Sequence, residues 1–115
     1  MVRIALTRWY TGLADLKLQQ KTRRYANIVG AEPTAVGIKS FKSRWGSCNA
    51  KGQIDFNWRI MMAPNRIVDY VVVHELCHLK KHDHSPQFWK RVERVIPDYL
   101  ECKGWLKQNG DSLFV

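Results

Sequence analysis

The sequence is short of the residues and stretches that mark several classes of protein. Only 7 glycines and 4 prolines occur among 115 residues, which excludes collagen-like and low-complexity chains. Its longest apolar stretch, 70–73, is far below the roughly 20 residues that span a bilayer. Charged residues near the start, such as Arg3 and Arg8, are unlike a signal peptide. We expect a folded cytoplasmic protein without membrane contact, with one domain over 1–115.

Cysteine is also scarce. The three cysteines, Cys48, Cys77 and Cys102, are odd in number and contain no CxxC pair. A disulfide framework is therefore not expected, and the pattern favours a reducing compartment. The simplest interpretation is three small, partly buried side chains.

Acidic residues are few in the first half of the chain. Residues 1–51 contain ten lysines and arginines against two acids, Asp15 and Glu32, whereas residues 52–115 contain nine against eight. The net charge of +9 is thus concentrated in 1–51. Such a field favours nucleic acid, nucleotides or other polyanions as partners, although a solvated basic helix without a ligand would give the same composition.

The order of hydrophobic patterns predicts an α+β fold. An amino-terminal helix is followed by a small antiparallel sheet of two or three strands, a buried helix that is apolar nearly all round, and two carboxy-terminal helices. Asn49 to Gly52 has the composition of a hairpin turn, and Asn109-Gly110 that of a helix end. The expected helices span about 6–28, 64–81, 86–96 and 98–107, and the strands begin near Val36, Ser43 and Gln53.

Alternation along residues 53–59 predicts a strand with two unlike faces. One face is expected in the core and the other is expected to be available to a ligand. The core face holds Ile54, Phe56 and Trp58, and the available face holds Asp55, Asn57 and Arg59. Four other side chains are also predicted to be core: Trp9, Tyr10, Trp105 and Leu106.

The buried helix contains the run His74-Glu75-Leu76-Cys77-His78, an HExxH pattern. A step of four residues places both imidazoles on one helix face, while Glu75 stands beside that face. Two histidines at this spacing are typical ligands of Zn²⁺, and the glutamate would act as general base towards a water molecule. The alternative is a pair of core histidines bonded to the backbone or to each other. Burying unsatisfied polar groups in an apolar helix is costly, which favours the metal.

A catalytic zinc site usually has a third protein ligand. The candidates downstream are His82, His84, Glu93 and Glu101. If the helix continued, His82 would lie about 12 Å from His74 along its axis, too far to share one cation. His84 follows the expected helix end, where the chain can fold back, and is favoured. His82 is then expected to donate a hydrogen bond to a metal ligand or to the transition state. If the third ligand is a glutamate instead, Glu93 is better placed than Glu101.

Four segments resemble the YgjP-like metallopeptidase family of the zincin superfamily, which is related to the SprT and Spartan proteases. They read SRWGSC at 43–48, GQIDFNWRI at 52–60, DYVVVHELCHL at 69–79 and HSPQFW at 84–89. The resemblance implies a minimal zincin-like domain with His74, His78 and His84 as zinc ligands and Glu75 as the catalytic residue. It also implies peptide substrates, which zincins commonly bind along a sheet edge. Metzincins share the histidine spacing, but Lys81 stands where their glycine would be.

Three functions are compatible with these features. The first is a zinc metallopeptidase that acts on a peptide or protein. The second is a metal-dependent nucleotide phosphohydrolase, with phosphate contacts from Arg23, Arg24, Lys42 and Arg44. The third is a DNA-associated protease or binding module that uses the basic residues of 1–51.

Several residues near the motif have weaker assignments. Residues 44–48 are expected either to line the cleft or to plug the core through Trp45. Tyr70 or Tyr99 is a candidate for oxyanion stabilisation beside His82. Cys48 is not expected to act as a nucleophile, because the histidines that could activate its thiol are assigned as metal ligands.

Overall fold

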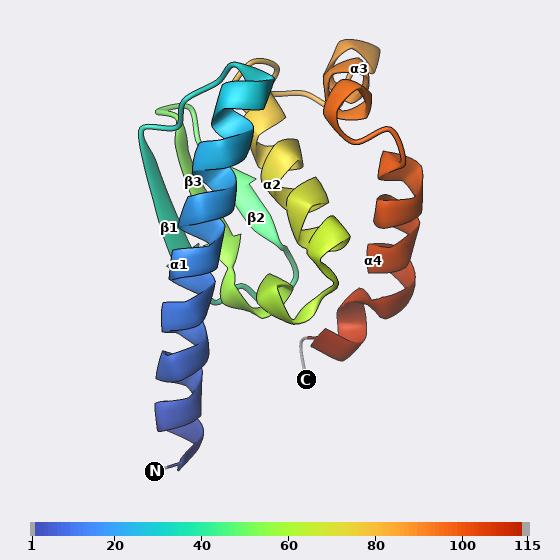
Figure 1. The fold of residues 1–115 in the computed structure, drawn as a ribbon. Coiled ribbons are helices and arrows are strands. Elements are labelled where there is room, and N and C mark those ends of the chain that lie inside the picture. The colour runs from blue at the N-terminus through green and yellow to red at the C-terminus, as the bar shows by residue number, and fades with distance from the viewer. Residues whose placement is uncertain (1, 114–115) are drawn as a thin grey trace.

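The computed structural model describes the backbone of residues 2–113 and the side chains of residues 8–112. The fold is α+β, as predicted. Helix α2 lies between α1 and α4, and the sheet lies behind α1 (Figure 1). The elements in chain order are α1 (Val2–Val29), β1 (Ala35–Lys39), β2 (Gly46–Cys48), β3 (Gln53–Asn57), the 3-10 helix η1 (Trp58–Met62), α2 (Asn65–His78), α3 (Pro86–Val95) and α4 (Tyr99–Leu113).

The sheet is mixed, whereas an antiparallel sheet was predicted. Its strand order is β1-β3-β2. The hairpin through Asn49 to Gly52 places β2 antiparallel to β3, as expected. The chain crosses from β1 to the opposite edge of β3 through 40–45, so β1 runs parallel to β3. Strands β1 and β2 are therefore the two edge strands of the sheet.

The prediction of one available face on β3 is wrong. Asp55 and Asn57 are 7% and 0% exposed. The Asn57 side-chain amide donates hydrogen bonds to the backbone carbonyls of Phe41 (3.1 Å) and Arg44 (3.0 Å), so the segment before β2 covers this end of the strand. Lys39 pairs with the Asp55 carboxylate at 3.4 Å. Because β3 is the central strand, it offers no free edge to a substrate either.

Helix α2 is the buried central helix that the sequence predicts. Its apolar residues on nearly all sides contact α1, α3, α4 and β2. Pro64 precedes its first residue, and the helix ends at His78, three residues before the predicted end at 81. No helix in residues 2–113 has both the length and the apolar character to cross a membrane. The fully buried residues of α2 are Ile67, Val68, Val72, Val73, Leu76 and Cys77.

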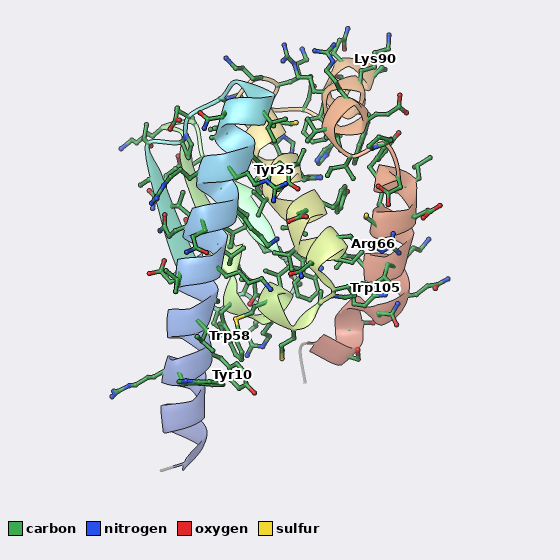
Figure 2. The ribbon with its side chains drawn as sticks, viewed as in Figure 1. Tyr10, Tyr25, Trp58, Arg66, Lys90 and Trp105 are labelled. Atoms are coloured by element: carbon green, nitrogen blue, oxygen red, sulfur yellow. The ribbon has the colours of Figure 1, made fainter. Side chains whose placement is uncertain are left out.

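Helix α1 is longer than predicted, and its apolar stripe is not core. Trp9 and Leu16 are 58% and 60% exposed. The first part of α1 extends beyond the sheet (Figure 1), and Leu16 lies between the fully buried Ala14 and Leu18, on a face turned away from the core. Tyr10 is half-buried and stacks on Trp58 of η1 at 6.1 Å between ring centroids (Figure 2). The core contacts of α1 come from another face, which holds Ala14, Leu18, Tyr25 and Ala26.

Helix α4 continues through Asn109-Gly110, where the sequence predicts its end. The Asn109 side chain donates to the Trp105 carbonyl at 3.0 Å within the helix. Gly110 is buried against Trp45: a Cβ at this position would lie 3.1 Å from the Trp45 ring atom Cζ2. The glycine at 110 thus permits close approach of a tryptophan and does not end the helix.

Candidate metal centre

Three imidazoles meet at one point of the molecule. His74 and His78 lie one turn apart on α2, and His84 comes from the segment between α2 and α3. The Nε2 atom of His84 lies 3.0 Å from Nε2 of His78 and 3.3 Å from Nε2 of His74. A tetrahedral zinc ion with bonds of about 2.0–2.1 Å would hold its nitrogen ligands at about this separation. The structure thus brings together the three predicted ligands.

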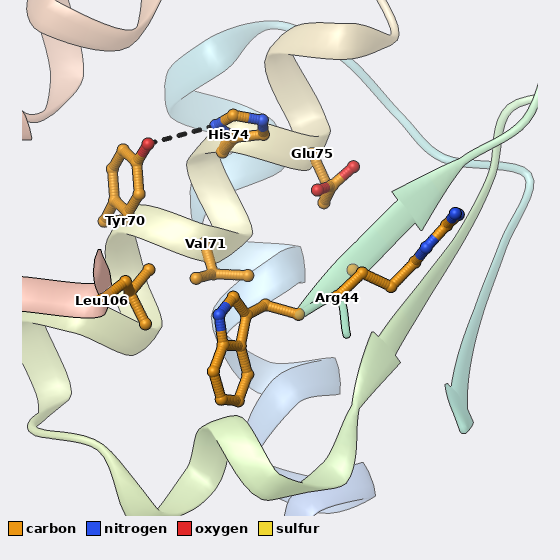
Figure 3. A pocket seen from close by; sticks show the side chains of 8 residues that line it. Arg44, Tyr70, Val71, His74, Glu75 and Leu106 are labelled. Carbon is orange, nitrogen blue, oxygen red and sulfur yellow. Dashed lines mark hydrogen bonds between the residues drawn. The ribbon is translucent and has the colours of Figure 1, made fainter. Parts of the chain in front are cut away.

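The other ring nitrogen of each helix histidine has its own partner. Nδ1 of His78 lies 3.1 Å from the Lys81 carbonyl, which can only accept, so this Nδ1 carries the proton. Nδ1 of His74 lies 3.3 Å from the Tyr70 hydroxyl, as the dashed line in Figure 3 shows. His78 therefore presents an Nε2 lone pair to the cluster, and His74 does the same in the tautomer in which its Nδ1 donates to the Tyr70 oxygen. This donor set fits a metal ion, which would satisfy them together.

The segment 84–89 holds His84 in place. Ser85 caps α3 by accepting a hydrogen bond from the Phe88 backbone nitrogen at 3.4 Å, and Pro86 occupies the first turn. Phe88 is fully buried and stacks on the His78 ring with centroids 4.3 Å apart. Trp89 stacks on the His84 ring at 5.7 Å. The cap and two aromatic side chains thereby fix the third imidazole.

Burial changes the ionisation of the histidines of α2. It lowers the pKa of His74 to about 3, and the neighbouring imidazoles of His78 and His84 add to the effect. The pKa of His78 is lowered as well, again mainly by burial. Both rings are therefore neutral at neutral pH, the form that binds a metal.

Glu75 lies beside the cluster and is 7% exposed. Burial raises its pKa to about 7, and the positive charge of Arg44 opposes the rise. Strand β2 passes close by: a Cβ on Gly46 would lie 3.0 Å from Cγ and 3.2 Å from Oε2 of Glu75. The carboxylate is thus confined between α2 and the edge strand.

Two adjoining pockets open at this point. The histidine pocket has a volume of about 270 Å³ and is lined by the three imidazoles together with β2 and His82. The apolar pocket has a volume of about 240 Å³ and is shown in Figure 3. Arg44, Gly46, His74 and Glu75 line both, so the two pockets adjoin one another. The remaining walls of the apolar pocket are Trp45, Tyr70, Val71 and Leu106.

The other predicted candidates have separate outcomes. Glu93 is exposed on α3, and Glu101 lies 3.6 Å from Arg66; neither belongs to the cluster. His82 is exposed at the histidine pocket, and Tyr99 stacks on Trp89 at 5.3 Å. Residues 44–48 line the two pockets, which agrees with the prediction that this segment lines the cleft.

Sequence reasoning missed some of the residues around the site. Leu106, predicted as core, is half-buried and lines the apolar pocket. The sequence did not single out Val71 or the Lys81 carbonyl. Helix spacing could have indicated Val71, because it precedes the motif by one helical turn. Of the predicted phosphate contacts, Arg44 lines the pockets, whereas Arg23 and Arg24 line other depressions.

The fold that carries the three-histidine cluster, with a carboxylate next to it and an edge strand alongside, is shared with a metallopeptidase of known structure. The crystal structure of the metallopeptidase zymogen of Pyrococcus abyssi abylysin superposes with a TM-score of 0.70. The match covers 79% of this chain and 93% of that one at 24% sequence identity. The shared feature is therefore the fold.

Residues 1–109 match the model of the YgjP-like metallopeptidase domain, and the chain belongs to this family. Its membership confirms the resemblance seen in the sequence and supports a hydrolase with a divalent metal. The chain is also 30% identical over 90 residues to the UTP pyrophosphatase of Escherichia coli (strain K12). That match covers 73% of this chain and 54% of the relative, so the chain spans about half the length of this curated relative.

Proposed function

We propose that the chain is a zinc-dependent hydrolase that cleaves peptide bonds. His74, His78 and His84 are the zinc ligands, and Glu75 is the general base. The observation that carries the proposal is the convergence of three Nε2 atoms beside a buried carboxylate, with the Nδ1 atoms of both helix histidines engaged elsewhere. Family membership and the metallopeptidase fold support the same class of reaction.

Each residue has a role that follows from its position. When bound, zinc supplies Lewis acidity to a carbonyl oxygen and to the attacking water. Glu75 follows His74 directly, so its carboxylate reaches the same space from the side, takes the proton from the water and delivers it to the leaving amine. Strand β2 is an edge strand of the sheet, so its backbone is placed to pair with an extended peptide, and Gly46 lets β2 pass close to Glu75.

The test compares Glu75→Gln with the parent chain. We expect unchanged zinc content by elemental analysis, because Glu75 is not a ligand, and a loss of hydrolysis of about 10²- to 10⁴-fold. The substrate is a library of proteome-derived peptides, with cleavage detected by mass spectrometry. His84→Ala is the matched control and should lose zinc and activity together. Full hydrolysis by the glutamine variant would refute the role of Glu75.

A second candidate is hydrolysis of a phosphoanhydride bond in a nucleoside triphosphate. It is favoured by the guanidinium of Arg44 beside both pockets and by the similarity to a UTP pyrophosphatase. Among the described residues, the histidine cluster is the one group suited to hold a metal, and it lacks the oxygen ligands that Mg²⁺ prefers. The peptidase proposal therefore ranks first.

UTP distinguishes the two candidates. Incubation with Zn²⁺, Mg²⁺ or Mn²⁺ should leave UTP intact if the chain is a peptidase, with pyrophosphate release as the readout. Release of pyrophosphate that disappears in Arg44→Ala, without cleavage of any peptide, would replace the first proposal with the second.

A further inference from the structure

Cationic side chains gather along one side of α1, away from the metal centre. Lys17, Lys21 and Arg24 recur at steps of four and three residues, so they lie on the same side of this helix. Together with Gln20 and Asn65 they line an open depression of about 350 Å³. Asn65 is the first residue of α2, so the positive end of that helix dipole adjoins the same depression. An anion placed there would meet positive charge from two helices.

The same side of α1 leads on to cations of α3, which contacts α1 near its carboxy-terminal end (Figure 1). Ile28 lies one helical turn after Arg24 and lines a second, smaller depression with Arg91 and Arg94 of α3. Both of these arginines are exposed, as is Arg24. The cations of the two helices therefore follow one line over the surface. We call Lys17, Arg24, Arg91 and Arg94 the basic band.

The members of the basic band are not neutralised by neighbouring acids. Lys21 pairs with Asp69 and for this reason is not counted in the band. Arg23, the neighbour of Arg24 in sequence, lines a different depression, which it shares with Glu32. Within the part of the chain that the structure describes, no ion pair includes a member of the band, and no acid lines its two depressions. Unneutralised cations along one line attract a polyanion.

The length of the basic band fits nucleic acid better than a nucleotide or a lipid surface. From Lys17 to Ile28 the axis of α1 rises about 16 Å, and duplex DNA of this length carries about ten phosphate charges. A single triphosphate would reach only one part of the band. A lipid surface needs apolar side chains beside the basic ones. The exposed Leu16 lies about 18 Å before Ile28 along the axis, far from the arginines of α3.

We propose that the basic band binds the phosphate backbone of a nucleic acid without reading its sequence. Its arginines and lysine would donate charge-assisted hydrogen bonds to phosphate oxygens, which position a protein on nucleic acid but do not distinguish bases. Arg91 and Arg94 lie outside 1–51, the region to which the sequence assigns this role. No member of the band lines a pocket of the metal centre, so the inference does not depend on the proposed hydrolysis.

The salt dependence of DNA binding tests the inference. The full chain is titrated into a fluorescently labelled duplex of about 20 base pairs, and anisotropy gives the affinity between about 50 and 200 mM salt. Four phosphate contacts predict a slope of about −3.5 in a plot of log K against log [salt], and hence about a hundredfold loss over this range. A second duplex of unrelated sequence should bind equally. A slope near zero, or a tenfold preference for one sequence, would overturn the inference.

Adjacent arginines provide a matched pair of variants. Arg24→Ala should reduce the magnitude of the slope by about one, because one phosphate contact is lost. Arg23→Ala removes the same charge from the same helix and should leave the slope unchanged. Combining Arg91→Ala with Arg94→Ala should reduce it by about two. Circular dichroism checks that each variant is folded. Equal effects of Arg23→Ala and Arg24→Ala would show that net charge, and not the band, binds the duplex.

Other ligands and the metal centre complete the test. Displacement of the duplex by micromolar UTP would assign the band to a nucleotide, and binding to phosphatidylserine vesicles without binding to DNA would assign it to a lipid surface; either result would overturn the inference. His84→Ala should bind the duplex as the parent chain does, because the band excludes the histidine cluster. DNA binding with the predicted slope in a chain that cleaves no peptide would support the band and refute the peptidase alone.

Discussion

The histidines of α2 present their Nε2 atoms to the cluster because each Nδ1 atom has a partner of its own. The partner of His78 is a backbone carbonyl, which no substitution removes, whereas the partner of His74 is the Tyr70 hydroxyl. Groups that orient a metal ligand in this way typically contribute a factor of about 10–100 to metal affinity. Tyr70 is therefore the residue through which the orientation of the ligands can be tested.

Tyr70→Phe should lower the affinity for zinc by about tenfold to a hundredfold, since the Nδ1 atom of His74 loses its hydrogen-bond partner. Competition with a chromogenic chelator measures the change. Tyr99→Phe removes a hydroxyl from a ring that stacks on Trp89 and is the matched control. Equal zinc affinity of both variants and the parent chain would show that the 3.3 Å contact does not orient the ligand.

Gly46 tests how closely the edge strand confines the proposed base. In Gly46→Ala the new Cβ would lie 3.0 Å from Glu75 Cγ and 3.3 Å from the Asp55 carbonyl oxygen, so the carboxylate must move. We expect turnover to fall by about tenfold to a hundredfold while zinc content stays the same, because small displacements of a catalytic group are costly. The measurement pairs peptide cleavage with elemental analysis. A variant with normal turnover would show that Glu75 tolerates displacement.

The thiols should differ in reactivity. Burial raises the pKa of Cys77 to about 11, and burial together with the negative charge of Glu75 raises the pKa of Cys48. The thiolate is the reactive form, so its fraction increases about tenfold per pH unit below the pKa. Cys48, which is half-buried, should react with iodoacetamide more slowly than a cysteine peptide and faster at higher pH.

Mass spectrometry over time, at pH 7 and pH 9, checks this order. Cys77 and Cys102 are fully buried and should stay unmodified until the protein unfolds. Urea-denatured protein is the control and should be labelled at all three positions. Rapid labelling of Cys48 at pH 7 would contradict the raised pKa.

Local signals in the sequence predicted where helices begin better than they predicted which helix residues are buried. Ser85 and Pro86 start α3 as the sequence indicates, because a cap and a fixed φ act within one turn. Trp9 and Leu16 share a face of α1, as their spacing shows, yet no element covers that face. Periodicity tells which residues lie together on a helix, and the fold decides whether a neighbour exists.

Replacing a glycine with alanine should change the free energy of unfolding in opposite directions at two positions, one within a helix and one just after a helix. Gly104→Ala in α4 meets nothing within 4 Å and should raise the free energy of unfolding by about 0.5–1 kcal/mol, because alanine is the better helix former. Gly30 follows α1 with φ +79°, a conformation that L residues rarely adopt, so Gly30→Ala should lower it by about 1 kcal/mol. Urea unfolding monitored by circular dichroism measures both. If both variants changed the free energy of unfolding in the same direction, helix propensity and backbone conformation would not explain the effects at these two positions.

The parts of the fold that the sequence could not predict are those made by long-range contacts. The spacing of His74 and His78 follows from helix pitch alone, and His84 requires only that the chain turn back after α2. The parallel pairing of β1 with β3 depends on a crossover through 40–45, for which no short-range pattern exists. The apolar pocket joins α2, β2 and α4, so Leu106 was indistinguishable from a core leucine.

The arrangement of the core also predicts how zinc affects folding. The buried hydrophobic cluster joins α1, β3, η1, α2, α3 and α4 without using an imidazole, so the metal-free chain should fold. Zinc that binds only the folded state, at a thousandfold excess over its dissociation constant, adds about 4 kcal/mol to the free energy of unfolding. A domain of this size should then show a rise in Tm of about 10 °C or more.

Differential scanning calorimetry with zinc, and again after addition of EDTA, measures this rise and its reversal. His84→Ala is the informative variant, because His84 is exposed and contributes little to the core. Its metal-free Tm should match that of the parent chain, while most of the zinc-dependent rise disappears. A metal-free chain without a cooperative transition would show that the core is insufficient and that the metal is structural. An equal rise in His84→Ala would instead show that the three imidazoles do not act as one site.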